Sequence, residues 1–176
     1  MKRTSFARMH CSLARGLDLI GDWWSPLIVR DLFLGVVRFD DLVEDLGISR
    51  NLLTRRLSAL ASSGIIARRA YQRRPVRYEY RLTEAGRDLV PAILALTAWG
   101  DRWAQPKEGS PMLFVHTTCG HQFLPQVTCS VCGEVIAGDA VQTIGGPGGA
   151  MKPGTRVLAK RLRAAGSLQG SFRRPA

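Results

Sequence analysis

Apolar positions between residues 39 and 63 follow a helical period in two consecutive stretches. They are Phe39, Leu42 and Leu46 in the first stretch and Leu53, Leu57 and Leu60 in the second. Steps of three and four residues place side chains on one side of an α-helix. Ser49 is a good N-cap because its hydroxyl can accept a free backbone N–H, and Gly64 suits a helix C-terminus. The pattern therefore predicts one helix over 39–46 and a second over 50–63.

The face of the second helix opposite its leucines is polar but contains no acidic residue. Its members are Asn51, Thr54, Arg55, Ser58 and Ser62. An ordinary amphipathic surface helix usually mixes glutamate with arginine, whereas this face carries only neutral and positive hydrogen-bonding groups. Two helices joined by a tight glycine turn, the second with such a face, are typical of a helix-turn-helix unit.

An alternating pattern after the second helix indicates strands. Over 76–82, apolar and charged residues alternate with the period of two that a half-buried strand shows. A shorter apolar and basic run over 65–71 precedes it, and the connector 72–75 ends in a proline, which favours a turn. Two strands with a basic tip after a helix-turn-helix unit predict a wing over 65–82.

Helical spacing also precedes this central region. It predicts a first helix over 11–20 and a second that begins near Asp22, a candidate N-cap, and ends at Gly35. Pro26 falls in the first turn of this second helix, where the missing N–H of proline does least harm.

A long helix is expected after the wing. Thr83 can cap it, and Glu84 begins it with a charge that suits a helix N-terminus. Pro91 lies inside the pattern and should kink or split the helix. The apolar stripe is broader than one small domain can bury, and it comprises Leu89, Val90, Ile93, Leu94, Leu96 and Trp103. The excess must pack either on residues from 112 onward or against a second copy of the chain.

Several separated motifs occur in a consistent order between residues 10 and 104. They are Cys11–Arg15, Leu17–Trp24, Leu27–Leu32, Arg38–Leu42, Gly47–Leu53, Arg56–Leu57, Tyr78 and Arg81–Gly86. In content and order these motifs resemble the HxlR branch of the winged-helix, MarR-like bacterial regulators. The resemblance implies a winged helix-turn-helix domain over 10–104. It also implies a homodimer, with the long helix and the first helix at the dimer contact.

The expected function is that of a dimeric DNA-binding transcriptional regulator. The helix over 50–63 would lie in the major groove, and the wing over 65–82 would contact the adjacent backbone. Asparagine and arginine suit adenine and guanine edges. The side chains expected at base edges are Asn51, Thr54, Arg55 and Ser58, and those expected at phosphates or in the minor groove are Arg50, Arg73, Arg74 and Arg77. A dimer would present two such helices to successive major grooves of double-stranded DNA, about 34–36 Å apart.

The distribution of charge favours a polyanionic partner. Of the formal net charge of +11, residues 50–87 contribute +8 and residues 152–176 contribute +7, so the remainder sums to −4. The positive charge is therefore concentrated on the expected recognition helix, the wing and the tail. An acidic protein or an anionic lipid is the alternative partner, but a lipid-binding helix would place large apolar residues beside its charges.

A cluster of cysteine and histidine residues occurs beyond the long helix. The turn Cys129–Gly133 has the C-x-x-C-G pattern that aims two thiolates at one metal, and His116–Gly120 repeats it with histidine in the first place. The expected ligands of a structural zinc ion are His116, Cys119, Cys129 and Cys132, with His121 as the alternative fourth ligand. A metal-free remnant or a disulfide is the competing interpretation, although a reducing cytoplasm opposes a permanent disulfide.

The fold class that follows is mainly α with a small β-wing, plus a small C-terminal zinc-ribbon-like β module. The winged helix-turn-helix domain over 10–104 is followed by a linker over 105–111. The zinc-ribbon-like module is expected over 112–144, and a flexible basic tail over 145–176, beginning with a glycine-rich linker.

Cys11 stands apart from the other three cysteines, at the start of the first helix. The helix N-terminus and the neighbouring Arg8 and His10 favour a lowered thiol pKa, and the resemblance implies a candidate redox sensor at this position. The competing interpretation is a small apolar residue buried at the dimer contact.

Other functional classes receive less support. No Ser–His or Cys–His pairing stands out as catalytic, there is no phosphate-binding loop or zinc-deaminase motif, and the one expected metal cluster is saturated with protein ligands, so an enzyme is not expected. No apolar run approaches the roughly 18 residues of a membrane span, and the N-terminus lacks a secretory signal, so we expect a cytoplasmic protein without a membrane partner. The alternative function is a protein-interaction module in which the ribbon and the basic tail bind a partner protein. Truncation after Trp103 would abolish activity if the protein is such an interaction module. If it is a DNA-binding regulator, the same truncation should leave DNA binding largely intact.

Overall fold

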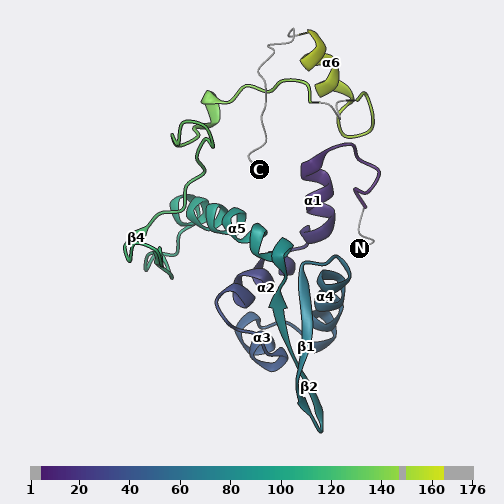
Figure 1. The fold of residues 1–176 in the computed structure, drawn as a ribbon, viewed down its shortest axis with the longest axis vertical. Coiled ribbons are helices and arrows are strands. Elements are labelled where there is room, and N and C mark those ends of the chain that lie inside the picture. The colour runs from purple at the N-terminus through teal and green to yellow at the C-terminus, as the bar shows by residue number, and fades with distance from the viewer. Residues whose placement is uncertain (1–4, 147–149, 165–176) are drawn as a thin grey trace. The chain divides into compact units, whose positions relative to one another are not determined.

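Six α-helices, four strands and one short 3₁₀-helix make up the described part of the computed structural model, which covers residues 5–146 and 150–164 (Figure 1). In chain order they are α1 (Ser12–Ile20), α2 (Trp24–Phe33), α3 (Phe39–Leu46), α4 (Arg50–Ser62), β1 (Ile66–Arg73), β2 (Val76–Leu82), α5 (Glu84–Trp103), β3 (Phe114–Val115), β4 (Gln122–Phe123), η1 (Gly138–Ala140) and α6 (Arg156–Ala164). Two compact units result. One comprises Ile20–Ile136, and the other is formed by the segments on either side of it.

The helix boundaries of the first unit follow the predicted capping residues. The side-chain oxygen Oγ of Ser49 accepts the N–H of Leu52 at 3.4 Å and begins α4, which ends one residue earlier than expected. Gly47, at φ 61°, adopts the left-handed conformation that ends α3. Asp22 caps α2 as expected, because its Oδ1 accepts the N–H groups of Trp24 and Ser25 at 2.9 and 3.0 Å.

The long helix α5 differs from the prediction in one respect. Thr83 caps it as expected, accepting the N–H of Gly86 at 3.2 Å. The helix then runs without interruption from Glu84 to Trp103, so of the two predicted outcomes at Pro91, a kink or a split, the split is wrong. Pro91 and Arg87, whose carbonyl loses its helical partner, both lie on the exposed side of the helix. Water can therefore hydrogen bond to that carbonyl, and the cost of the proline is tolerated.

The wing is a two-stranded antiparallel ribbon that projects beyond helices α2 to α4 (Figure 1). Its register pairs Ile66 with Leu82 and Arg73 with Val76, with a bulge between Ala70 and Gln72. The N–H of Tyr80 donates to the carbonyl of Val37 at 2.8 Å, so the segment before α3 extends the sheet beside β2. The predicted helix-turn-helix and wing are thus confirmed.

One apolar core holds the winged-helix elements together. Its buried members are Ile28, Val29, Leu32, Leu42, Ile48, Leu53, Leu57, Leu60, Ile65 and Ile66. Each large apolar side chain that is fully buried contributes about 1.5–3 kcal/mol. The three leucines of α4 all belong to this core, so burial of one face of α4 fixes which face is left outside.

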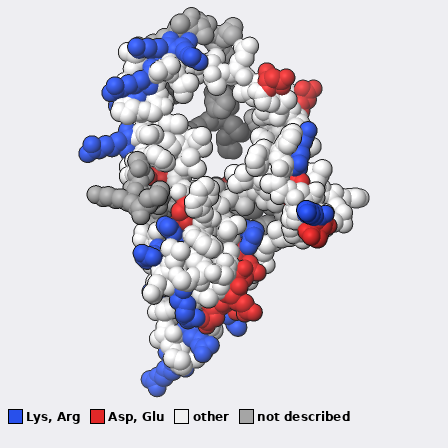
Figure 2. Space-filling model, turned by 180° about the vertical axis from the view of Figure 1, so that it is seen from behind, with Lys and Arg blue, Asp and Glu red and all other residues white. Residues whose placement is uncertain are grey.

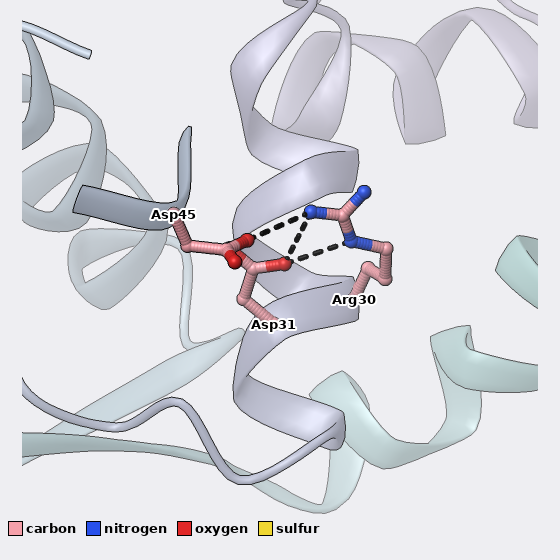
Figure 3. A network of polar contacts seen from close by, with 3 residues as sticks. All are labelled: Arg30, Asp31 and Asp45. Carbon is pink, nitrogen blue, oxygen red and sulfur yellow. Dashed lines mark hydrogen bonds and ion pairs between the residues drawn. The ribbon is translucent and has the colours of Figure 1, made fainter. Parts of the chain in front are cut away.

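Arg30 of α2 bridges the buried carboxylate of Asp31, on the same helix, to Asp45 of α3 (Figure 3). Asp31 is 1% exposed and accepts a hydrogen bond from Nε of Arg30 at 2.8 Å. The same guanidinium reaches Oδ2 of Asp45 on α3 at 3.2 Å. Burial raises the pKa of Asp31, and the repulsion of Asp45 adds to this, although Arg30 acts in the opposite direction.

The apolar stripe of α5 meets the residues beyond 112 along only part of its length. Ile93, Leu94 and Thr97 line a small groove together with residues of α2 and with Met112 and Phe114. Farther along the helix, the side chains of Leu96, Trp99 and Trp103 remain 58%, 59% and 66% exposed. One side of the stripe therefore meets residues beyond 112, which is the first of the two expected alternatives, and the other side stays exposed among the described residues.

The C-terminal segments contain little regular structure. Strands β3 and β4 pair antiparallel, and residues 128 and 135 form an isolated bridge in the next hairpin. Within the expected basic tail, Arg156–Ala164 form α6, while residues 147–149 and 165–176 lie outside the described residues. None of the described helices has the length and apolarity that a membrane span requires.

Candidate nucleic-acid interface

The outer face of α4 presents the four predicted base-contacting side chains to solvent. Asn51, Thr54, Arg55 and Ser58 are all exposed, whereas the leucines on the opposite face are 0–1% exposed. The hydroxyl of Thr54 donates to the carbonyl of Arg50 at 2.8 Å, so its hydrogen is already used within the helix. Thr54 can therefore offer a partner only acceptor lone pairs, while Asn51 and Arg55 retain donors.

Arg50, a predicted phosphate ligand, interacts with α3 in this structure. Its Nη1 lies 2.8 Å from Oδ1 of Asp40, and its guanidinium lies 4.9 Å from the ring centroid of Phe39. Both charged side chains are mostly exposed, and an exposed ion pair contributes only about 0–1 kcal/mol. Exchange of Asp40 for a phosphate group would therefore cost little.

Arg56 is directed away from this face and towards the interior of the unit. Its Nε lies 3.3 Å from Oδ1 of Asp22, the same oxygen that caps α2. Arg56 thus ties α4 to the N-terminus of α2 and is a positioning residue. Sequence reasoning assigned it no role, although its place three residues after Leu53 and four before Leu60 put it on the leucine side.

The three arginines predicted at the wing lie at or next to the hairpin turn. Arg73, Arg74 and Arg77 are exposed, and none has a carboxylate partner in the described part of the chain. The side chain of Gln72 donates to the carbonyl of Arg74 at 3.0 Å across the turn. Figure 2 shows basic side chains gathered where the β1–β2 hairpin ends. This uncompensated positive charge suits the phosphate backbone of a nucleic acid.

Three further arginines of the wing region were missed by sequence reasoning. Arg68 lies over the ring of Tyr78 at 4.1 Å, and Arg38, just before α3, lies over the ring of Tyr71 at 5.2 Å. Arg69 is exposed on β1. The stacking depends on cross-strand register and on the position of the segment before α3, neither of which the local pattern specifies.

Glu79 is the acidic residue of β2, and it is neutralised locally. Its Oε1 accepts a hydrogen bond from Nε of Arg81 at 2.9 Å. That bond lowers the pKa of Glu79 and raises that of Arg81. Arg69, which is paired with Glu79 across the ribbon, and Arg38 lower the pKa of Glu79 further, so this carboxylate is surrounded by positive charge.

The predicted zinc ligands are gathered in two pairs. Sγ of Cys119 lies 3.4 Å from Nδ1 of His116. Hydrogen bonds from the backbone N–H groups of Cys132 and Val131 and from the thiol of Cys132 lower the pKa of the Cys129 thiol. No three His, Cys, Asp or Glu side chains converge on one point among the described residues. The zinc site therefore stays a prediction.

The position of Cys11 leaves both interpretations of its role as predictions. Cys11 precedes α1, and its carbonyl accepts the N–H of Arg15 at 3.0 Å. It is half-buried, and its thiol is free. The N–H of the neighbouring His10 donates to the carbonyl of Pro153 at 2.8 Å, and a Cβ added at Gly154 would lie 3.1 Å from Cβ of Met9 and 3.6 Å from Cβ of Cys11. The segment before α6 thus lies beside Cys11.

Comparison with known proteins relates this geometry to helix-turn-helix regulators. A relative from Mycobacterium tuberculosis (strain H37Rv), an uncharacterized HTH-type transcriptional regulator, is 45% identical over 137 residues, which is 78% of this chain and 87% of that one. A continuous stretch of that length in a chain of 176 residues must include 40–137. An uncharacterized regulator of Bacillus subtilis (strain 168), YdeP, is 35% identical over 53% of this chain and 73% of its own.

Solved structures of transcription factors are also similar to this chain. The crystal structure of PA1607, a putative transcription factor, superposes with a TM-score of 0.69 at 34% identity and covers 80% of this chain and 98% of its own. The putative transcription factor PA1374 from Pseudomonas aeruginosa superposes with a TM-score of 0.56 at 34% identity and covers 84% of this chain and 100% of its own. The family model of the HxlR-like helix-turn-helix matches residues 19–108, which include α2 to α5 and the wing. The chain therefore belongs to the HxlR-like helix-turn-helix family.

Proposed function

We propose that this protein is a homodimeric, sequence-specific transcriptional regulator that binds double-stranded DNA. Helix α4 enters the major groove with Asn51, Arg55 and Ser58 at base edges, and the wing lies on the adjacent backbone. The observation that carries this proposal is the combination of an exposed, acid-free face on α4 with unpaired arginines on the neighbouring hairpin. Membership of a family whose relatives are named transcriptional regulators supports it.

Helix α4 and the wing have different roles because their side chains differ in chemistry. Asn51 and Arg55 can each form two parallel hydrogen bonds, to adenine and to guanine respectively, and so distinguish bases. Arg73, Arg74 and Arg77 carry charge at the tip of a ribbon and would bind phosphate without regard to sequence. Arg50 would join them after it releases Asp40. The side chains of α4 therefore recognise the base sequence, and the arginines of the wing contribute most of the salt-dependent affinity.

A second copy of the chain is the proposed partner of α5. Leu96, Trp99 and Trp103 are spaced by three and four residues, so they form one stripe on the helix surface. Large exposed aromatic side chains in a contiguous stripe are typical of an interface between proteins. Association through a two-fold axis would bury the stripe against itself and would place two α4 helices on one face of a duplex.

The test is selection of bound sequences from a random duplex library, run beside a measurement of mass in solution. The proposal predicts a dimer and an enriched motif with two related half-sites, whose centres lie about 10–10.5 base pairs apart or at a multiple of that spacing. A protein that remains monomeric, or a library without an enriched motif after several rounds, would contradict it.

A further inference from the structure

The segment from 114 to 136 contains the same hairpin twice, offset by thirteen residues along the sequence. In each copy a cross-strand residue pair flanks a turn, and a backbone N–H from the first turn position donates to the carbonyl five residues later. The first copy has the pair Val115–Gln122 and the bond from His116 to His121 at 2.9 Å, and the second has the pair Thr128–Val135 and the bond from Cys129 to Glu134 at 2.8 Å. The two copies therefore share backbone structure as well as sequence.

The two turns also share their internal geometry. The N–H of the fifth residue donates to the carbonyl of the first, from Gly120 to His116 at 2.7 Å and from Gly133 to Cys129 at 2.8 Å. Both glycines have positive φ, 73° and 76°, which other residues rarely adopt. This conformation places the side chains of positions one and four on the same side of each turn. In both copies these positions hold a histidine or a cysteine.

Neither hairpin has a buried apolar core of its own, although the rings of Phe114 and Phe123 in the first hairpin lie 6.3 Å apart. No residue from 112 to 136 is buried, and several large apolar side chains of this segment, including Leu124 and Val131, are exposed. The three cysteines of the segment are free, so no disulfide links the hairpins. A module this small without a core or a disulfide usually depends on a bound metal or on a partner.

We infer that His116, Cys119, Cys129 and Cys132 bind one Zn²⁺ ion that joins the two hairpins. Three thiolates and one imidazole match the preference of Zn²⁺ for four sulfur and nitrogen ligands in tetrahedral geometry. Binding displaces the three thiol protons into solvent and changes no oxidation state, so no oxidant or reductant is needed. Each hairpin already gathers its own two ligands, and the ion supplies the free energy that brings the two turns together.

The internal repeat also decides between the two candidate histidines. His116 corresponds to Cys129, the first position of the second turn, whereas His121 corresponds to Glu134, the residue after the turn glycine. His121 uses its backbone carbonyl to close the hairpin. His116 is therefore the fourth ligand. With four protein ligands the site is closed to substrate, and its role is structural.

The experiment uses the full-length protein stripped of metal under reducing conditions and titrated with Co²⁺ and then Zn²⁺. Co²⁺ in a tetrahedral thiolate site gives intense visible absorption and sulfur-to-metal charge-transfer bands, which Zn²⁺ then abolishes by displacement. The inference predicts one ion per chain. Cys129→Ser and His116→Ala should each weaken Zn²⁺ binding by more than about 100-fold, because even residues that only support metal ligands cost 10–100-fold.

Two matched variants serve as controls. Cys11→Ser removes a thiol outside the hairpins, and His121→Ala removes the alternative histidine, and both should bind the ion like the wild type. Absence of the tetrahedral spectrum, a stoichiometry unaffected by Cys129→Ser, or a Cys129–Cys132 disulfide in protein purified without reductant would overturn the inference. Loss of binding in His121→Ala but not in His116→Ala would overturn the assignment of the fourth ligand.

Discussion

At the scale of single residues, the positions of α4 and the wing depend on contacts at their junction with α5. Thr83 donates to the carbonyl of Gly64 at 2.6 Å, and its backbone N–H donates to the carbonyl of Ile65 at 3.1 Å. Because Thr83 also caps α5, it joins the end of the wing, the turn after α4 and the start of α5. Gly86 completes this junction, since an added Cβ there would lie 2.2 Å from the oxygen of Ile65.

Gly86→Ala is therefore expected to lower the free energy of unfolding by about 1–3 kcal/mol or more, because a backbone carbonyl cannot move as easily as a side chain. The matched control is Gly100→Ala in the same helix, where an added Cβ meets no atom within 4 Å. That substitution should raise stability by about 0.5–1 kcal/mol. Denaturant unfolding of both variants measures the difference. Equal effects of the two substitutions would contradict the close packing of Gly86 against the carbonyl of Ile65.

The buried carboxylate of Asp31 predicts a particular dependence of stability on pH. Its pKa in the folded protein is raised above the ordinary value of 3.8, mainly by burial, so the folded state binds the proton more tightly than the unfolded state. Stability due to this group is therefore highest below 3.8 and falls as the pH rises through the raised pKa.

Asp31→Asn should remove that fall. Unfolding of the wild type and of Asp31→Asn is measured from about pH 3 to about pH 7, with Asp139→Asn as an exposed control. The stability of the wild type relative to Asp31→Asn is expected to decline as the pH rises. A relative stability that increases with pH would instead indicate that Arg30 dominates and that the pKa of Asp31 is lowered.

At the scale of elements, the outward face of α4 is a consequence of its buried face. Leu53, Leu57 and Leu60 anchor the helix in the core, and Arg56 ties it to Asp22. The side chains that remain outside are those the periodicity of the sequence had predicted. Local signals of spacing and capping were sufficient for α3, α4 and the wing because each of these elements agrees with the core that it joins.

Other features could not be predicted locally. The ion pair of Arg50 with Asp40 and the stacking of Arg38 on Tyr71 depend on how separate elements meet. The continuity of α5 through Pro91 depends on which side of the helix faces water. Spacing predicted the two ligand pairs at 116–119 and 129–132, but it could not show how far apart the two turns lie. That distance is a property of tertiary packing, and this segment has no core to define it.

The wing predicts a specific change in the salt dependence of DNA binding. Arg73→Ala with Arg74→Ala should weaken binding to every duplex sequence and flatten the slope of log K against log salt by about 0.9 for each phosphate that the variant no longer neutralises. The control, Arg8→Ala with Lys107→Ala, removes the same charge from exposed positions outside the wing. Slopes measured by anisotropy titration that change equally in both variants would show that the wing makes no particular phosphate contact.

At the scale of the whole molecule, two copies of the chain would act together on one duplex. The exposed stripe of Leu96, Trp99 and Trp103 on α5 forms the proposed contact between copies, and each copy contributes one α4 and one wing. Two half-sites then double the free energy of discrimination between DNA sequences that one helix provides. The zinc-bound hairpins would lie beyond α5 in each copy, outside the DNA-binding elements, so that loss of the metal should leave α4 and the wing intact.

The most direct measurement is the ratio of dissociation constants for the selected duplex and a scrambled duplex, compared between the wild type and Asn51→Ala. This substitution leaves the net charge unchanged, so binding that is independent of sequence should stay nearly constant. A bidentate contact from Asn51 to adenine contributes about 1–3 kcal/mol of discrimination, so the ratio should fall by about 5- to 150-fold per half-site. A ratio that Asn51→Ala leaves unchanged would contradict the claim that the outer face of α4 reads the bases.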